Sequence, residues 1–152
     1  MANPMYGQNK FDSALSDSPR LIVGPEFGFG DDDAAVENGS ILNNSRVAIP
    51  AGTLVERVAV LVTTVGAGGT AGTTDINIGY DGDDDFFLSD VDHNTGYLGT
   101  VDNVLFQGND DTDHQTAKYF SSANVIQAKV IAKSATSGKA RLLVWTSDLA
   151  AV

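Results

Sequence analysis

Apolar and polar residues alternate with a period of two along much of this sequence, which is the pattern of β-strands. The segment 55–63 has the strongest alternation, and one of its faces holds Val58, Val60 and Val62. Its other face is also largely apolar. A strand that is apolar on both faces is predicted to lie in the centre of a sandwich, or to be covered on its second side.

Several other segments have the same extended pattern, and turn-forming residues separate them at short intervals. They are 21–23, 26–29, 47–49, 75–80, 125–133 and 140–146. No segment shows a strong helical period, so the missing crossover helices argue against a parallel α/β fold. We therefore expect an all-β chain of about eight short strands, folded as an antiparallel β-sandwich, with the jelly roll as one candidate topology. The stretch from Ser134 to Gly138 predicts a hairpin loop between the last two strands.

The first nineteen residues have a different composition and predict an extended N-terminal arm ahead of a sandwich domain at 20–152. The arm is mostly polar, with spaced apolar side chains at Met5, Tyr6, Phe11 and Leu15. These provide too little apolar surface to order the segment alone. Two interpretations stay open: a disordered terminus, or an arm that orders on a neighbouring subunit through those four side chains.

Charge is distributed unevenly along the chain and narrows the classes of partner. The net charge is −11 at pH 7, and the sixty residues between Arg57 and Lys118 contain no Lys or Arg but eleven of the twenty carboxylates. Such a chain repels the phosphate backbone of nucleic acids and the surfaces of acidic membranes. There is no cysteine, which excludes disulfides and thiolate chemistry. Residues 1–5 lack the features of a signal peptide, so synthesis in a cytoplasm is expected.

The acidic segment from Asp81 to Asp85 is the one candidate for a metal site. Alternate carboxylates at Asp81, Asp83 and Asp85 are able to converge on a calcium ion through oxygen ligands. An EF-hand is excluded, because that loop requires glycine where this chain has Phe86. A calcium site of another kind and a solvated acidic turn both stay open, and no other cofactor is expected.

Catalytic residues are not indicated. His93 and His114 each follow an aspartate, but neither is accompanied by a nucleophile motif, so two surface histidines are favoured over a small hydrolase. Trp145 lies opposite the predicted core positions of the last strand. It is interpreted either as core on the second face or as an anchor at a subunit interface, where tryptophan is enriched.

Three parts of the sequence together resemble small structural proteins of tailed bacteriophages. They are the turn 49–53 before a valine-rich strand, the segment 76–88 with its isoleucine-glycine strand and Asp-Gly turn, and the opening residues 1–9. The resemblance implies a capsid decoration (cement) protein: a non-enzymatic β-sandwich outside the phage head, often trimeric, bound to the major capsid protein. It implies no role for any individual residue. The alternative is a head-fibre or tail-fibre adhesin domain that binds host glycans.

Overall fold

The computed structural model describes residues 19–29, 39–67, 75–92, 104–106, 117–132 and 137–149, and these ranges contain strands and turns but no helix. The strands are β1 (Arg20–Gly28), β2 (Val47–Ile49), β3 (Thr53–Ala67), β4 (Asp75–Tyr80), β5 (Asp83–Asp92), β6 (Val104–Phe106), β7 (Lys118–Phe120), β8 (Asn124–Ala132) and β9 (Ser137–Asp148). No helix in the described ranges is of the kind that crosses a bilayer. Residues 1–18 lie outside these ranges, so the arm and its boundary stay predictions.

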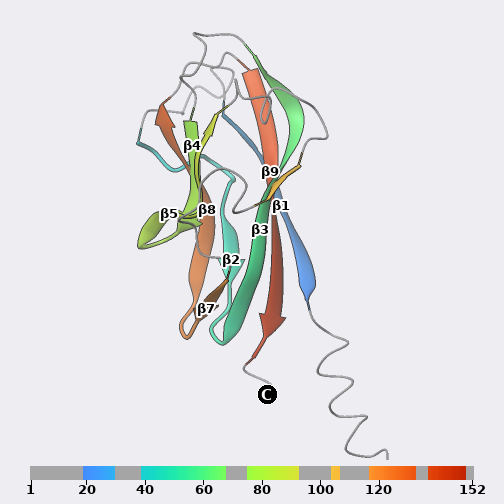
Figure 1. Ribbon diagram of the computed structural model, residues 1–152, viewed down its shortest axis with the longest axis vertical. Coiled ribbons are helices and arrows are strands. Elements are labelled where there is room, and N and C mark those ends of the chain that lie inside the picture. The colour runs from blue at the N-terminus through green and yellow to red at the C-terminus, as the bar shows by residue number, and fades with distance from the viewer. Residues whose placement is uncertain are drawn as a thin grey trace, which may run out of the picture.

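The strands form two antiparallel sheets that lie side by side in Figure 1. Sheet A has the order β1-β9-β3-β6, with β7 also paired to β3, and sheet B has the order β2-β8-β4-β5. The predicted all-β antiparallel sandwich is confirmed. Its period-two segments pair as strands because alternate side chains enter one core while the others face outward.

The segment 55–63 lies within β3, a central strand as predicted. β9 pairs along the length of β3 on one side, and β6 and β7 pair with it on the other. Val58, Val60 and Val62 are all buried. The second face of the segment is the outer face of sheet A, where Arg57 is exposed and Leu61 and Thr63 are partly exposed.

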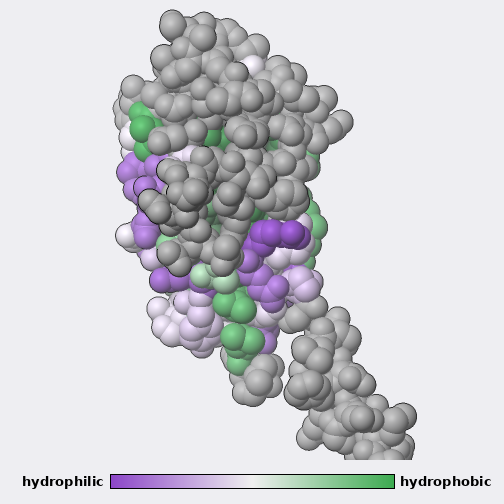
Figure 2. Space-filling model, viewed as in Figure 1, coloured by the Kyte–Doolittle hydropathy of each residue, from purple (hydrophilic) through white to green (hydrophobic). Residues whose placement is uncertain are grey.

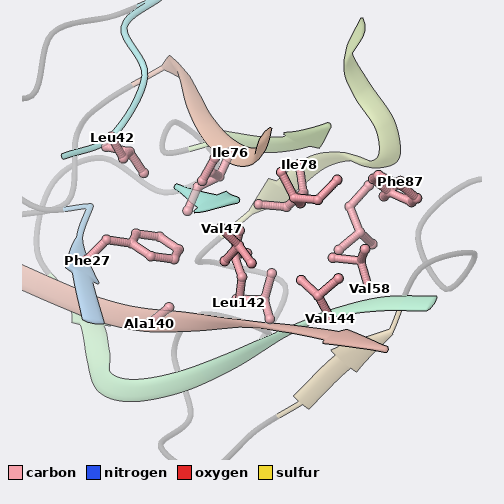
Figure 3. Close-up of a cluster of buried hydrophobic side chains, with 14 of the residues drawn as sticks. Phe27, Leu42, Val47, Val58, Ile76, Ile78, Phe87, Ala140, Leu142 and Val144 are labelled. Carbon is pink, nitrogen blue, oxygen red and sulfur yellow. The ribbon is translucent and has the colours of Figure 1, made fainter. Parts of the chain in front are cut away.

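The core lies between the two sheets and draws on both of them. Figure 3 shows Leu142 and Val144 of β9 directed toward side chains of the opposite sheet, including Ile76 and Ile78 of β4. These side chains have no exposed surface. Burying a side chain of this size contributes about 1.5–3 kcal/mol, so the shared core holds the sheets together.

One predicted connection is wrong. The loop near residues 134–138 does not join a hairpin, because β8 belongs to sheet B and β9 belongs to sheet A. The described part of β9 already begins at Ser137. A short, polar sequence with a glycine is compatible with a hairpin turn and also with a connection between facing sheets. The alternation within β8 and β9 is the same for both connections, so it does not distinguish them.

β1 is the edge strand of sheet A, and it combines the two apolar pieces 21–23 and 26–29 with a break between them. The register against β9 shifts between Val23 and Glu26, where Gly24 and Pro25 form the irregularity. Proline has no N–H for a ladder and is tolerated at bulges and edges. The strand therefore keeps one pairing partner, β9, within the described ranges.

Candidate interaction surfaces

The β4–β5 hairpin (residues 75–92) carries the acidic segment singled out in the sequence. Tyr80 pairs with Asp83, so the connection consists of Asp81 and Gly82 alone. Gly82 has a φ of 122°, a backbone conformation that favours glycine. Three of the five residues expected in an acidic loop, Asp83 to Asp85, belong instead to strand β5. A loop was expected because aspartate is disfavoured in strands. In the structure Asp83 pairs with Tyr80 at the start of β5, and Asp84 and Asp85 continue the same strand.

β5 bows outward immediately after this turn, as the projecting ribbon in Figure 1 shows. The pairing moves from Tyr80–Asp83 to Ile78–Leu88, so β5 has several more residues than β4 over this stretch. Gly79 makes the bulge possible. A Cβ atom at Gly79 would lie 2.0 Å from the carbonyl oxygen of Asp83 and 2.3 Å from the carbonyl carbon of Asp84. The backbone of β5 thus occupies the space that a side chain would fill.

The three carboxylates of the bulge have different surroundings. Asp84 Oδ2 lies 2.6 Å from Lys129 Nζ on β8, and both side chains are partly exposed. Burial raises the pKa of Asp83, and the neighbouring Asp85 raises it further through a side-chain hydrogen bond and charge repulsion. The backbone of Asp85 and the ammonium of Lys118 oppose this shift. Asp83 and Asp85 are therefore close together, while Asp84 is paired with Lys129 of β8, on the far side of β4.

The turn itself is fixed to the start of β8. The backbone N–H of Asp81 donates to Asn124 Oδ1 at 3.1 Å, and the Asn124 amide donates back to the Asp81 carbonyl at 3.4 Å. The Asp81 side chain is exposed. No group of three or more His, Cys, Asp or Glu side chains within the described ranges gathers as a metal site. A calcium ion at Asp81, Asp83 and Asp85 stays a prediction.

An aromatic cluster beside this hairpin joins the two sheets, and the sequence alone does not reveal it. The Tyr80 ring lies 5.4 Å from Phe86 and 5.3 Å from Phe120 on β7, both edge to face. Lys118 Nζ lies 5.0 Å from the Tyr80 ring centroid and 5.3 Å from that of Phe86. These contacts attach the turn end of the acidic hairpin to β7 of sheet A.

Trp145 lies on the outer face of sheet A and is half-buried. Its neighbours in β9, Val144 and Thr146, are buried toward the other face. The guanidinium carbon of Arg57 lies 4.2 Å above the tryptophan ring, which is a cation–π contact. The tryptophan is thus outside the main core. Its role as an interface anchor stays a prediction.

Trp145 forms part of an apolar surface that we call the sheet A patch, defined as Leu21, Val23, Leu143 and Trp145. Leu21 pairs with Trp145, and Val23 pairs with Leu143, so all four share one face. Leu21 is 45% exposed and Val23 is 54% exposed. In the edge-on view of Figure 2, hydrophobic colour follows part of the margin where sheet A lies and the end of the sandwich near the C terminus.

The charges of the described strands separate between the two sheets. The strands of sheet A hold five basic side chains (Arg20, Arg57, Lys118, Lys139, Arg141) against three carboxylates (Glu26, Glu56, Asp148). The strands of sheet B, together with the Asp81–Gly82 turn, hold Lys129 against seven aspartates, all seven in the β4–β5 hairpin. The sandwich has one slightly basic and one strongly acidic layer.

The other predicted site residues are not placed. Met5, Tyr6, Phe11 and Leu15 of the expected arm lie outside the described residues, and so do His93 and His114. Of the predicted carboxylates, the structure brings Asp83 and Asp85 together. It also places Lys118 near Asp83, Lys129 against Asp84 and Arg57 over Trp145. Those three basic residues come from segments far from the hairpin or the tryptophan in sequence, so local patterns contain no signal for them.

No protein-family model and no curated protein matches this sequence. Two solved structures share its fold. A chain of the acidic stable capsid structure of Helicobacter pylori bacteriophage KHP30 matches with a TM-score of 0.58 and 20% identity, over 86% of this chain and 87% of that one. A chain in the capsid of Ralstonia phage GP4 matches with a TM-score of 0.57 and 13% identity, over 86% of each chain. The sandwich is therefore a fold that occurs in the capsids of bacteriophages.

Proposed function

We propose that this chain is a non-enzymatic structural protein of a phage virion, which binds the outside of the head and stabilises the capsid. The observation that carries the proposal is the match of its fold, over most of both chains, to chains of two phage capsid structures. A match of this extent includes both sheets rather than one shared motif. The major capsid protein is the proposed partner.

The order of the strands supports a jelly-roll topology within this proposal. β6 and β7 pair with the same edge of β3, so they take the place of one interrupted strand. With that pair counted once, the strands of the described ranges number eight, four in each sheet, and the chain passes repeatedly from one sheet to the other. Double-sheet jelly rolls of eight strands are characteristic of viral capsid and lectin domains.

The proposed mechanism combines a rigid sandwich with an adaptable arm. A head that contains packaged DNA is stabilised when added protein contacts cross the junctions between capsid subunits. Residues 1–19 would add such contact area by ordering on the capsid through Met5, Tyr6, Phe11 and Leu15, at an entropic cost. A homotrimer would multiply the contact through effective concentration. An acidic surface that faces outward would limit aggregation of particles.

Heads of the encoding phage, stripped of this chain, provide the test. Co-sedimentation of the full-length protein with the stripped heads should be saturable, and it should raise the temperature at which the heads release DNA. Absence of binding would contradict the proposed function. A matched variant with serine at Met5, Tyr6, Phe11 and Leu15 keeps the arm length and should bind more weakly. Unchanged affinity of this variant would contradict the role of the arm alone.

A glycan-binding adhesin domain is the second candidate. It is favoured by two observations: the strand order supports a fold that lectins use, and two carboxylates, Asp83 and Asp85, meet at an exposed hairpin. This candidate predicts that calcium raises the melting temperature and that the protein binds host glycans only with calcium present. An unchanged melting temperature in calcium together with no glycan binding would exclude it.

A further inference from the structure

We propose that the outer face of sheet A is a docking surface for a second copy of this chain, which presents its acidic β4–β5 hairpin to that face. The contact is head to tail: each copy offers sheet A to one neighbour and the hairpin to another. The inference does not depend on binding to a phage head, because both surfaces belong to the chain itself.

The apolar part of the docking surface is the sheet A patch. Leu21 and Val23 are about half exposed, although they are large apolar residues on an edge strand. Edge strands of soluble proteins commonly carry charge that prevents association, whereas an apolar edge favours it. The patch continues inward to the half-buried Trp145, and tryptophan is enriched at the centres of protein interfaces. A partner that covered the patch would remove this apolar surface from water.

The charges around the patch identify the occupant. Arg57 is exposed and stacks on Trp145, and Arg141 on the same face donates to the Gly24 carbonyl at 3.1 Å. The carboxylates nearby are already engaged. Glu26 accepts from Thr63 Oγ1 at 2.8 Å and lies 3.8 Å from Lys139, and Glu56 accepts from the Ser147 hydroxyl. These hydroxyl contacts leave both carboxylates charged, but the face carries three basic side chains, Arg57, Lys139 and Arg141, against Glu26 and Glu56. The face therefore has a small basic excess in a strongly acidic protein, and an acidic partner complements it.

A self-complementary contact between two sheet A faces is disfavoured. A two-fold axis there would bring the same basic side chains of both copies together, and like charges across an interface cost several kcal/mol. The other layer of the sandwich has the required sign. All seven aspartates of sheet B and its turn lie in the β4–β5 hairpin, which contains no Lys or Arg.

The hairpin also has a suitable shape. It bows outward from the sandwich in Figure 1, and Asp81 and Asp85 are exposed on it. The partly buried Phe86 follows Asp85 directly, so carboxylates and an aromatic ring lie close together. Head-to-tail contacts close into a ring when the rotation between copies permits, which is the geometry that a cyclic trimer requires.

Sedimentation equilibrium of the purified full-length chain tests the proposal at low and high salt. We expect an oligomer whose dissociation constant rises with salt. Arg57→Glu should raise that constant about tenfold or more, and so should the double change Asp81→Lys with Asp85→Lys. All three changes in one chain should restore affinity to near the original value, because both signs are then reversed. Circular dichroism confirms that each variant is folded.

Two controls separate this contact from general effects of charge and hydrophobicity. Arg46→Glu changes an exposed arginine near β2, on the opposite edge of sheet B from the hairpin, and should leave the oligomer unchanged. Val23→Thr removes apolar character from the patch while keeping a β-branched residue, and it should weaken the oligomer. Leu149→Thr, at a residue 41% exposed outside both surfaces, should not.

Three results would overturn the proposal. One is a protein that stays monomeric at every accessible concentration. Another is an oligomer that tolerates both charge reversals. The third is a combined variant that is folded but no tighter than either reversal alone.

Discussion

The two sheets contribute to one core but have opposite outer surfaces. Sheet A has a long pairing between β3 and β9, an exposed apolar patch and a small excess of basic side chains. Sheet B has a strongly acidic edge, where β5 leaves its register with β4 and bulges over Gly79. The inner faces therefore specify the sandwich through their shared core. The outer faces are not bound by that requirement, so they are able to differ in charge and hydrophobicity and to bind separate partners.

The largest expected effect tests whether the core belongs equally to both sheets. Ile78→Ala in β4 and Leu142→Ala in β9 each truncate a side chain with no exposed surface. Each change should lower the free energy of unfolding by about 2–5 kcal/mol, because it removes buried apolar groups and leaves a cavity. Urea titration measures the loss. A large loss in only one of the two variants would contradict a core shared between the sheets.

A second pair of changes compares how tightly each sheet is packed at a glycine. Gly79→Ala would place a Cβ atom against the backbone of Asp83 and Asp84, so we expect a loss of about 1–3 kcal/mol in the free energy of unfolding. Gly24→Ala in β1 would meet Val47 Cγ2 at 2.9 Å and the Leu142 carbonyl oxygen at 3.2 Å, and should cost less. Thermal unfolding of both variants checks the order. A more harmful change at Gly24 would show that the bulge of β5 adapts.

A smaller effect is expected from the ion pairs on the two outer faces. Lys129→Met breaks the 2.6 Å ion pair between Lys129 and Asp84, whose side chains are 28% and 38% exposed respectively. We expect a loss of up to about 1 kcal/mol in the free energy of unfolding, since solvent screens such pairs. Lys139→Met breaks the longer 3.8 Å pair with Glu26 and should cost less. Double-mutant cycles at low and high salt measure both pairs, and equal coupling energies would remove this distinction between the sheets.

The smallest effect is a dependence on pH that arises in sheet B. Burial and Asp85 raise the pKa of Asp83 above its ordinary value of 3.8, so the folded state binds this proton more tightly than the unfolded state does. Asp83 therefore lowers stability above its raised pKa, and that penalty disappears as the pH falls through it. Asp83→Asn should melt higher than the original protein near neutral pH, and the difference should shrink in acid. Calorimetry across about pH 3.5 to about pH 7 measures it. A difference that grows in acid would contradict the raised pKa.

The positions of strands followed from the sequence because their signal is local. The predicted segment 75–80 coincides with β4, and 125–133 overlaps nearly all of β8. Alternation also predicted the buried faces, as Ile126, Ala128 and Val130 show. Each of these predictions needs only the residues of one strand. The assignment of strands to sheets was less accessible, because β8 and β9 have the same pattern whether they form a hairpin or face each other across the core.

The surfaces were predicted less completely for the same reason. The acidic residues were evident, but the pairing of Asp84 with Lys129 joins residues 45 positions apart. Trp145 was correctly placed opposite the core positions of its strand. The arginine that stacks on it comes from β3, and no local pattern links the two. Contacts across a sheet depend on the register, which one sequence does not specify by itself.

β8 and β9, the last two strands within the described ranges, are also central strands of the two sheets. β9 lies between β1 and β3, and β8 lies between β2 and β4. During synthesis on the ribosome, neither sheet is able to assemble in its final order until residues 124–148 have been translated and have left the exit tunnel. The first hundred or so residues must therefore remain soluble as an incomplete nascent chain. The long acidic stretch without Lys or Arg, which is translated before β8, would help to keep that nascent chain from aggregating.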